Sequence, residues 1–299
     1  MNSIATQDER LDHFKTVPIH NKIAITMDTL NDEAEDVMDG KRDALICFGG
    51  SGLGKNHVID KVIGSHAPEG ERVSIDSPKD YKTVLAGFHD ATYGRKRALP
   101  LVMDEAHLIF QNPRNLNIMK MATDGIGKKY ISDYVWYTEE IGPQGGIKKV
   151  PHWGVSLKAP IFIMTNTNLH SMPKANVSHA NALFSRIQPI LIPDDRLLAW
   201  EYCVWLAMEK NVINTVAGKT VSLADRAKAL EWFTANLWNM DQVSVRTMMA
   251  IVKEMVLARS PAKLEAKLET LLLPVSQRSY GRPVPPLNAD DFRTLKMAW

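Results

Sequence analysis

The sequence predicts an α/β protein, with a parallel five-stranded β-sheet covered by helices on both faces and followed by a small all-helical domain. Short apolar runs alternate with segments of helical periodicity up to residue 193, and only helical periodicity continues beyond it. Alternating strands and helices favour a parallel sheet, because each connecting helix covers one of its faces. The 299 residues are enough for one large domain or two modest ones.

Five short apolar runs are the expected strands. The first of them ends in glycine, which is typical of a buried strand that leads into a turn. Segments with the apolar spacing of a helix follow the first two runs. The expected strands lie at 44–49, 71–76, 99–105, 160–166 and 187–193.

Changes in composition divide the chain into four parts. A polar N-terminal segment and an amphipathic helix precede the α/β domain, and a helical lid domain follows it. The last part has four prolines between Pro274 and Pro286 and is expected to be extended. Ser222 and Ser244 are expected to cap helices of the lid. The four parts cover residues 1–42, 43–193, 194–273 and 274–299.

The segment 128–158 interrupts the α/β pattern between the third and fourth expected strands. Aromatic and β-branched residues alternate on either side of a turn region rich in glycine, which predicts a β-hairpin.

A phosphate-binding loop is predicted where the first strand ends, because residues 49–55 fit the pattern G-x-x-x-x-G-K. Its glycines let the backbone turn its N–H groups toward phosphate oxygens, and the helix N-terminus adds positive potential. Lys55 supplies a full charge to the terminal phosphates. We therefore expect ATP to bind at Gly49, Gly50, Ser51, Gly52, Leu53, Gly54, Lys55, Asn56 and His57.

Asn56 departs from the usual pattern, which has Ser or Thr at this position to ligate Mg²⁺ through a hydroxyl group. An amide oxygen can also ligate a hard cation, but it extends one bond further. Two interpretations stay open. Either Asn56 is a metal ligand with altered geometry, or magnesium binding is weaker and ATP hydrolysis is slow.

Residues 101–105 form an apolar strand that closes with two carboxylates, Asp104 and Glu105. Phosphoryl transfer depends on positioning and on charge stabilisation, and such a pair can supply both. Asp104 is expected to hold Mg²⁺ through its water shell, and Glu105 to orient and deprotonate the attacking water. The alternative is an acidic turn on the surface.

The order of these motifs, with a helical lid after an α/β core, resembles the AAA+ ATPase superfamily over roughly residues 20–260. The loop and the acidic strand end are typical of P-loop NTPases in general. The sequences TNTN at 165–168, FSR at 184–186 and SVR at 244–246 narrow the resemblance to AAA+ proteins. More narrowly, the chain is similar to small ATPases encoded by bacteriophages and mobile elements.

This resemblance implies three further site residues. Asn166, preferred over Asn168, would lie beside the γ-phosphate, and an Asx-turn is the alternative. Arg186 would act in trans in the site of a neighbouring subunit, and an intrachain salt bridge is the alternative. Arg246 would extend from the lid to the nucleotide, and a solvated surface arginine is the alternative.

The resemblance also implies partners and a task. It implies a homo-oligomer, either a ring or a helical assembly, with hexamers commonest, that hydrolyses ATP with Mg²⁺ at its subunit interfaces. A role in DNA replication, helicase loading or DNA remodelling is the favoured interpretation. The alternatives are a protein-remodelling ATPase and a slowly hydrolysing, nucleotide-dependent scaffold that does not act on nucleic acid.

Charge gives limited support to nucleic-acid binding, because the net charge is only +2. The predicted hairpin nevertheless combines aromatic residues with lysines, which suits a nucleic-acid backbone and unstacked bases. The alternative is that the aromatic residues Tyr134, Trp136 and Trp153 pack on the hairpin's own core. The candidate nucleic-acid contacts are Lys128, Lys129, Lys148 and Lys149.

Two further features bear on location. Cys47 and Cys203 lie in apolar stretches and are expected to be buried free thiols. The polar N-terminal segment does not fit a secretory signal, and no apolar run is long enough to span a bilayer. A cytoplasmic location without membrane partners is therefore expected.

Overall fold

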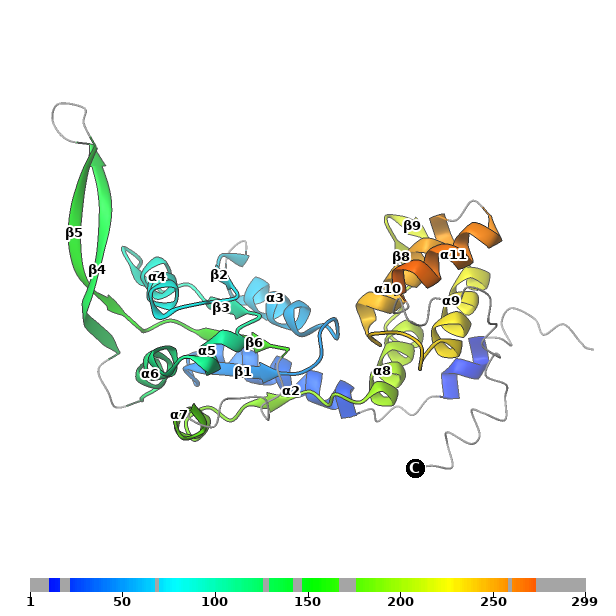
Figure 1. The fold of residues 1–299 in the computed structure, drawn as a ribbon, viewed down its shortest axis with the longest axis horizontal. Coiled ribbons are helices and arrows are strands. Elements are labelled where there is room, and N and C mark those ends of the chain that lie inside the picture. Colours follow the sequence, from blue (N-terminus) through cyan, green and yellow to red (C-terminus); the bar gives the residue numbers. More distant parts are fainter. Residues whose placement is uncertain are drawn as a thin grey trace, which may run out of the picture. The chain divides into compact units, whose positions relative to one another are not determined.

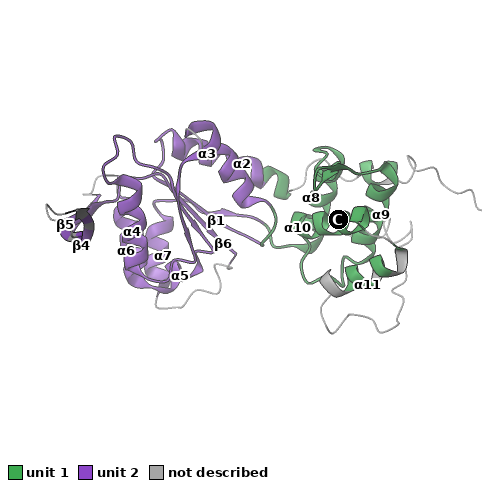
Figure 2. Ribbon diagram, turned by 90° about the horizontal axis from the view of Figure 1, so that it is seen from above, with its two compact units in different colours: residues 1–25, 51–53, 193–299 green, residues 26–50, 54–192 purple. Residues whose placement is uncertain are grey.

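The computed structural model describes residues 11–16, 22–67, 70–125, 129–141, 147–166, 176–257 and 260–272 (Figure 1). Lys128, Asn168 and the predicted tail at 274–299 lie outside these residues. The chain forms two compact units, which Figure 2 distinguishes by colour. An α/β unit comprises 26–50 and 54–192, and a helical unit comprises 1–25, 51–53 and 193–299.

The α/β unit contains a parallel five-stranded sheet in the order β2-β3-β6-β1-β7. All residues of β1 and β6 are buried, as expected for strands covered on both faces. The predicted fold class is confirmed, although the last strand is shorter than the expected 187–193. The strands are β1 (Ala44–Phe48), β2 (Val73–Asp76), β3 (Leu101–Asp104), β6 (Ile161–Thr165) and β7 (Ile190–Leu191).

Helices cover both faces of this sheet, with α2 and α3 on one side and α4 to α7 on the other (Figure 2). Alternate residues of β1, namely Ala44, Ile46 and Phe48, enter the core cluster beneath α4 to α7. The helices are α2 (Lys22–Met38), α3 (Lys55–His66), α4 (Tyr81–Thr92), α5 (His107–Gln111), α6 (Pro113–Ala122) and α7 (Val177–Phe184).

An antiparallel ribbon is formed by β4 (Tyr130–Ile141) and β5 (Ile147–Ser156). One face of the ribbon is anchored to α4. The Trp136 ring stacks on His152 with 4.2 Å between centroids, and it contacts His89 and Tyr93 at 3.7 and 4.3 Å. These contacts fix which face of the ribbon points away from the unit.

Gly154 is a position in the ribbon that requires glycine. Its φ is +80°, and a Cβ there would lie 1.9 Å from the hydroxyl oxygen of Tyr130. The Tyr130 hydroxyl group donates a hydrogen bond of 3.0 Å to the carbonyl of Trp153. The tyrosine ring therefore occupies the space that a side chain at position 154 would need.

The helical unit contains the predicted lid helices. The side chain of Ser222 accepts a hydrogen bond from Asp225 N, and that of Ser244 accepts one from Thr247 N, so both predicted caps are confirmed. Its helical elements are η1 (His13–Thr16), α8 (Arg196–Met208), α9 (Leu223–Ala235), α10 (Val245–Leu257) and α11 (Pro261–Leu272).

A short hairpin, β8 (Thr215–Val216) and β9 (Lys219–Thr220), lies between α8 and α9 and was not predicted. Its two turn residues both have positive φ, 50° at Ala217 and 75° at Gly218. This is the two-residue turn whose twist matches an antiparallel pair. Gly218 could have indicated this turn from the sequence, because glycine readily adopts a positive φ. Ala217 could not, because alanine is rare in this conformation.

Both cysteines are buried and free, as expected. Burial raises the pKa of Cys47 to about 12 and also raises the pKa of Cys203. Neither thiol is therefore suited to act as a nucleophile at neutral pH.

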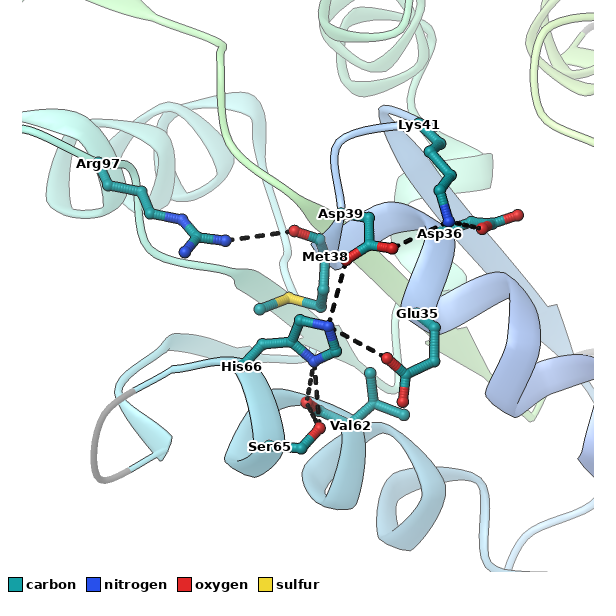
Figure 3. A network of polar contacts seen from close by, with 9 residues as sticks. All are labelled: Glu35, Asp36, Met38, Asp39, Lys41, Val62, Ser65, His66 and Arg97. Carbon is teal, nitrogen blue, oxygen red and sulfur yellow. Dashed lines mark hydrogen bonds and ion pairs between the residues drawn. The ribbon is translucent and has the colours of Figure 1, made fainter.

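A charged network joins the C-terminal ends of α2 and α3 (Figure 3). Nε2 of His66 lies 3.1 Å from a Glu35 carboxylate oxygen and 3.4 Å from one of Asp39. The Lys41 ammonium group contacts Asp39 at 2.9 Å and Asp36 at 3.0 Å. Lys41, and to a smaller extent His66, hold the pKa of Asp39 below its ordinary value of 3.8.

The Asp39→Asn variant should lose stability at neutral pH but not in acid. A carboxylate with a lowered pKa stabilises the folded state above its unfolded-state pKa, and this contribution is lost as the pH falls through the folded-state pKa. Urea unfolding of both proteins should therefore show a gap at pH 7 that closes below about pH 4. A gap that persists in acid would contradict the assignment. The network is exposed, so added salt should also narrow the gap.

Candidate nucleotide-binding site

The loop between β1 and α3 is shaped by its glycines. Gly49 N donates to Thr165 O at 3.2 Å, which joins the loop to β6. A Cβ at Gly49, whose φ is +154°, would lie 2.6 Å from Cβ of Ile192. Gly54 has a φ of +102° immediately before α3 begins. Glycine at these positions allows a turn that a side chain would block.

The N–H groups of this loop are available to an anion. Within the described part of the chain, nothing accepts a hydrogen bond from the backbone N–H groups of Gly50 through Gly54. The loop carbonyls, in contrast, already have donors. Lys55 donates to those of Gly49 and Gly50 at 2.7 and 2.8 Å. Unpaired N–H groups at a helix N-terminus form an anion-binding concavity, so the loop fits the phosphates of a nucleotide.

Lys55 brings the loop and the fourth predicted strand together. Its side chain is 5% exposed, and its ammonium group donates to Oδ1 of Asn166 at 2.9 Å. Asn166 directly follows β6, whose neighbours in the sheet are β1 and β3. The carboxyl ends of parallel strands meet at one edge, which explains why residues 111 positions apart are in contact.

Asn56 and Asp104, the two expected metal ligands, are also in contact. The Asn56 side-chain amide donates a hydrogen bond to Oδ2 of Asp104 at the end of β3. One carboxylate oxygen and one amide oxygen are ligands that suit Mg²⁺, so the residues fit this ion. The same hydrogen bond must open if the ion is to lie between the two side chains. His57, the remaining predicted contact, is exposed in the first turn of α3.

Glu105 has an unusual backbone conformation, with a φ of +47°. Its N–H group donates to the Asp104 side chain at 2.8 Å, and its carboxylate accepts a hydrogen bond of 3.2 Å from the hydroxyl of Ser77. Left-handed backbone at a residue other than glycine costs on the order of 1 kcal/mol and often marks a functional position. The turn brings the carboxylate within hydrogen-bonding distance of Ser77, at the end of the neighbouring strand β2.

Ser77 is a site residue that sequence reasoning missed. It directly follows β2, the strand beside β3, and it is itself left-handed, with a φ of +49°. Its backbone N–H group donates to Asp104 O at 2.9 Å. The sequence could have indicated Ser77, because it is a polar residue that directly follows a predicted strand of the parallel sheet.

Arg186 lies just beyond the C-terminal end of α7 and is exposed. Its guanidinium group donates to the carbonyl of Ala182 within its own chain. Among the described residues it forms no ion pair, so the alternative of an intrachain salt bridge is not observed.

Arg246 belongs to the helical unit, as do residues 51–53. Its backbone N–H group donates to Gly52 O at 3.4 Å, and the Gln242 side chain donates to Ser51 O. A Cβ at Gly52 would lie 2.8 Å from the Ser244 hydroxyl oxygen. Residues 242–246 therefore donate hydrogen bonds to the carbonyl groups of Ser51 and Gly52. Gln242 is a second contact residue that the sequence analysis did not identify.

The ribbon lysines that were expected to contact nucleic acid lie among acidic residues. Lys129 forms an ion pair with Asp43, and Lys149 lies opposite Glu139 in the strand register. Lys148 lies opposite Glu140. Glutamates therefore lie across the ribbon from two of these lysines, and the nucleic-acid role of the segment stays a prediction.

The aromatic residues of the ribbon divide between its two faces. Tyr134 and Trp136 are partly buried, and Tyr134 packs against the core of the α/β unit. Burial raises the pKa of Tyr134. Trp153, in contrast, is 69% exposed. Packing on the protein's own core therefore accounts for two of the three aromatic residues that the sequence singled out.

Comparisons with known proteins leave the family of this chain open. No protein-family profile and no curated protein matches it. Among solved structures, domain III of the replication initiation protein DnaA from Thermotoga maritima is 12% identical. That match covers 89% of this chain and 92% of the other, with a TM-score of 0.43.

A proline-to-glycine mutant of RuvB from Thermotoga maritima is a second similar structure. It is 13% identical, and the match covers 98% of this chain and 78% of the other, with a TM-score of 0.41. Identities and scores this low carry no conclusion about activity. No helix among the described residues has the length and apolar character needed to cross a membrane.

Gly49→Ala should destabilise the protein by about 1–3 kcal/mol, because the added methyl group would overlap Ile192. Gly64→Ala is the matched control, since Gly64 lies in α3 with nothing within 4 Å of its added Cβ. That change should be neutral or stabilising by about 0.5–1 kcal/mol. Urea unfolding measures both, and equal effects would contradict the close approach at Gly49.

Proposed function

We propose that this chain is an ATPase of the AAA+ type that binds ATP with Mg²⁺ and hydrolyses it slowly as a homo-oligomer. The observation that carries the proposal is a convergence at one sheet edge. Lys55 contacts Asn166, and Asn56 contacts Asp104, beside a loop whose N–H groups have no acceptor among the described residues. These residues come from three strand ends, and a triphosphate with its metal needs all of them.

The residues divide the work of binding. The N–H groups of the loop would surround the phosphate oxygens, and Lys55 would move its ammonium group from the loop carbonyls to the terminal phosphates. Asp104 and Asn56 would hold Mg²⁺, which neutralises charge on the β- and γ-phosphate oxygens when it is bound. The ordinary AAA+ pattern has a hydroxyl group in place of the Asn56 amide.

Slow turnover follows from Asn56. Its amide already donates to Asp104, so metal binding must replace an existing hydrogen bond. Glu105 would orient the attacking water and accept its proton, and Asn166 would align the γ-phosphate. Ser77 would hold the Glu105 carboxylate through the hydrogen bond already present.

Assembly would complete the site. Arg186 is exposed and has no carboxylate partner among the described residues, so it is available to a neighbouring copy. An arginine supplied in trans can accelerate phosphoryl transfer by on the order of 10³–10⁵. Arg246 would contribute from the lid. A hexamer is the assembly that the AAA+ resemblance favours.

Three variants separate binding from hydrolysis. Lys55→Ala should abolish measurable affinity for ATP in calorimetric titration, because it removes the cation that faces the phosphates. Glu105→Gln should keep ATP affinity and lower turnover by about 10²-fold or more, because it removes the base. Asn56→Thr should raise turnover, because a hydroxyl group restores the shorter ligand.

The proposal would be contradicted if the unmodified chain had no affinity for either ATP or ADP. Equal and fast turnover in the unmodified chain and the Asn56→Thr variant would remove the idea of slow hydrolysis alone. Circular dichroism of each variant controls for misfolding.

We also propose that the task is directed at DNA, as in the bacteriophage and mobile-element ATPases that the sequence resembles. A protein-remodelling role or a nucleotide-dependent scaffold is the alternative. Because Lys148 and Lys149 lie opposite glutamates in the strand register, we propose that the main DNA contacts lie outside this pair of lysines.

Single-stranded DNA should therefore raise ATP turnover, and higher salt should weaken DNA binding as phosphate contacts are screened. The double change of Lys148→Ala with Lys149→Ala should leave this affinity nearly unchanged. Indifference of turnover to DNA, together with stimulation by a protein, would favour the remodelling alternative.

A further inference from the structure

The face of the ribbon that points away from α4 has a distinct composition. Side chains alternate along a strand, and directly opposite residues of an antiparallel pair share a face. Trp136 and His152 are paired in register and lie on the face that packs on α4. The register pairs on the other face are Val135 with Trp153, Tyr137 with Pro151, and Glu139 with Lys149, and we call this the outer face.

The outer face exposes several large apolar side chains. Trp153 is 69% exposed and Tyr137 is 61% exposed. Ile147, at the start of β5, is 70% exposed. Contiguous exposed patches of a few hundred Å² on a soluble protein commonly mark an interaction site. Rigid aromatic side chains are also the groups that dominate binding energy when they become buried.

The charges on this face identify what it can bind. Glu139 and Lys149 are both exposed, and neither forms an ion pair within the described part of the chain. One acid and one base side by side have no net charge, so this pair gives no long-range attraction for a polyanion. They do make the face complementary to itself. A two-fold rotation would place each acid against the base of the other copy.

Face-to-face contact does not depend on the backbone donors of the strand edges. Pro151 in β5 has no N–H group and so adds no donor to either edge of that strand. Stacking of two outer faces needs no such donors and would bury Trp153 and Tyr137 in both copies.

We propose that the outer face of the ribbon docks on the same face of a second copy of this chain, about a two-fold axis. Lys149 then faces Glu139 of the partner subunit, and the exposed aromatic residues fill the centre of the contact. One face of a two-stranded ribbon is narrow, so we expect it to bury less than a standard interface of about 1,600 Å² and to associate weakly and reversibly. The contact is separate from the ATP site and does not depend on the function proposed for that site.

Charge reversal tests the proposal in a way that a general loss of stability cannot imitate. Without nucleotide, sedimentation velocity of the unmodified chain should show self-association that rises with protein concentration. Lys149→Glu alone and Glu139→Lys alone should each weaken it by about tenfold or more, because each puts like charges opposite each other twice. An equimolar mixture of the two variants should restore association, because acid again faces base.

Apolar variants give a matched control. Trp153→Ser should abolish the association, whereas Trp238→Ser should not, because Trp238 is similarly exposed, at 55%, but lies in the helical unit. All of these variants should keep the thermal stability and ATP affinity of the unmodified chain, which separates this test from that of the ATP site.

The proposal would be overturned by an unmodified chain that stays monomeric at every concentration, or by a mixture that fails to restore association. A third outcome also overturns it. If Lys149→Glu abolishes binding of labelled single-stranded DNA and the mixture does not recover it, the outer face binds nucleic acid.

Discussion

The arrangement of the site depends on the hydrogen bonds that the buried ammonium group of Lys55 donates. A positive charge that is only 5% exposed needs oxygen partners, and here it has Gly49 O, Gly50 O and Asn166 Oδ1. These contacts draw the loop after β1 against the end of β6. They also occupy the carbonyls, so that the face of the loop left for a ligand consists of N–H groups. The loop is therefore organised to bind an anion.

Much of the fold could be predicted because its signals are local. Apolar runs and helical spacing identified the sheet and three of its covering helices, α2, α3 and α4, and the glycine pattern located the loop. Contacts that depend on the spatial order of strands could not be predicted this way. Ser77 and Glu105 are 28 residues apart and meet because β2 and β3 are neighbours. The hairpin at 215–220 was missed since Ala217 adopts a backbone conformation that alanine seldom populates.

The ribbon shows what composition alone leaves out. Lysines and aromatic residues occur together in its sequence, which suggests a nucleic-acid surface, and this stays a prediction. The register adds that each of Lys148 and Lys149 lies opposite a glutamate. Both Trp136 and Trp153 lie in strands of the ribbon, yet one is stacked against α4 and the other is exposed. Only the pairing of the two strands determines which side chains share a face.

Helix α3 joins two charged ends. It begins at Lys55 and ends at His66, a span of 12 residues or about 18 Å. A helix of this length moves nearly as a rigid rod, so a shift of its first turn must be accommodated where His66 meets Glu35 and Asp39. A ligand that displaced the loop before Lys55 would therefore also disturb the contacts of His66 with Glu35 and Asp39, at the opposite end of the helix.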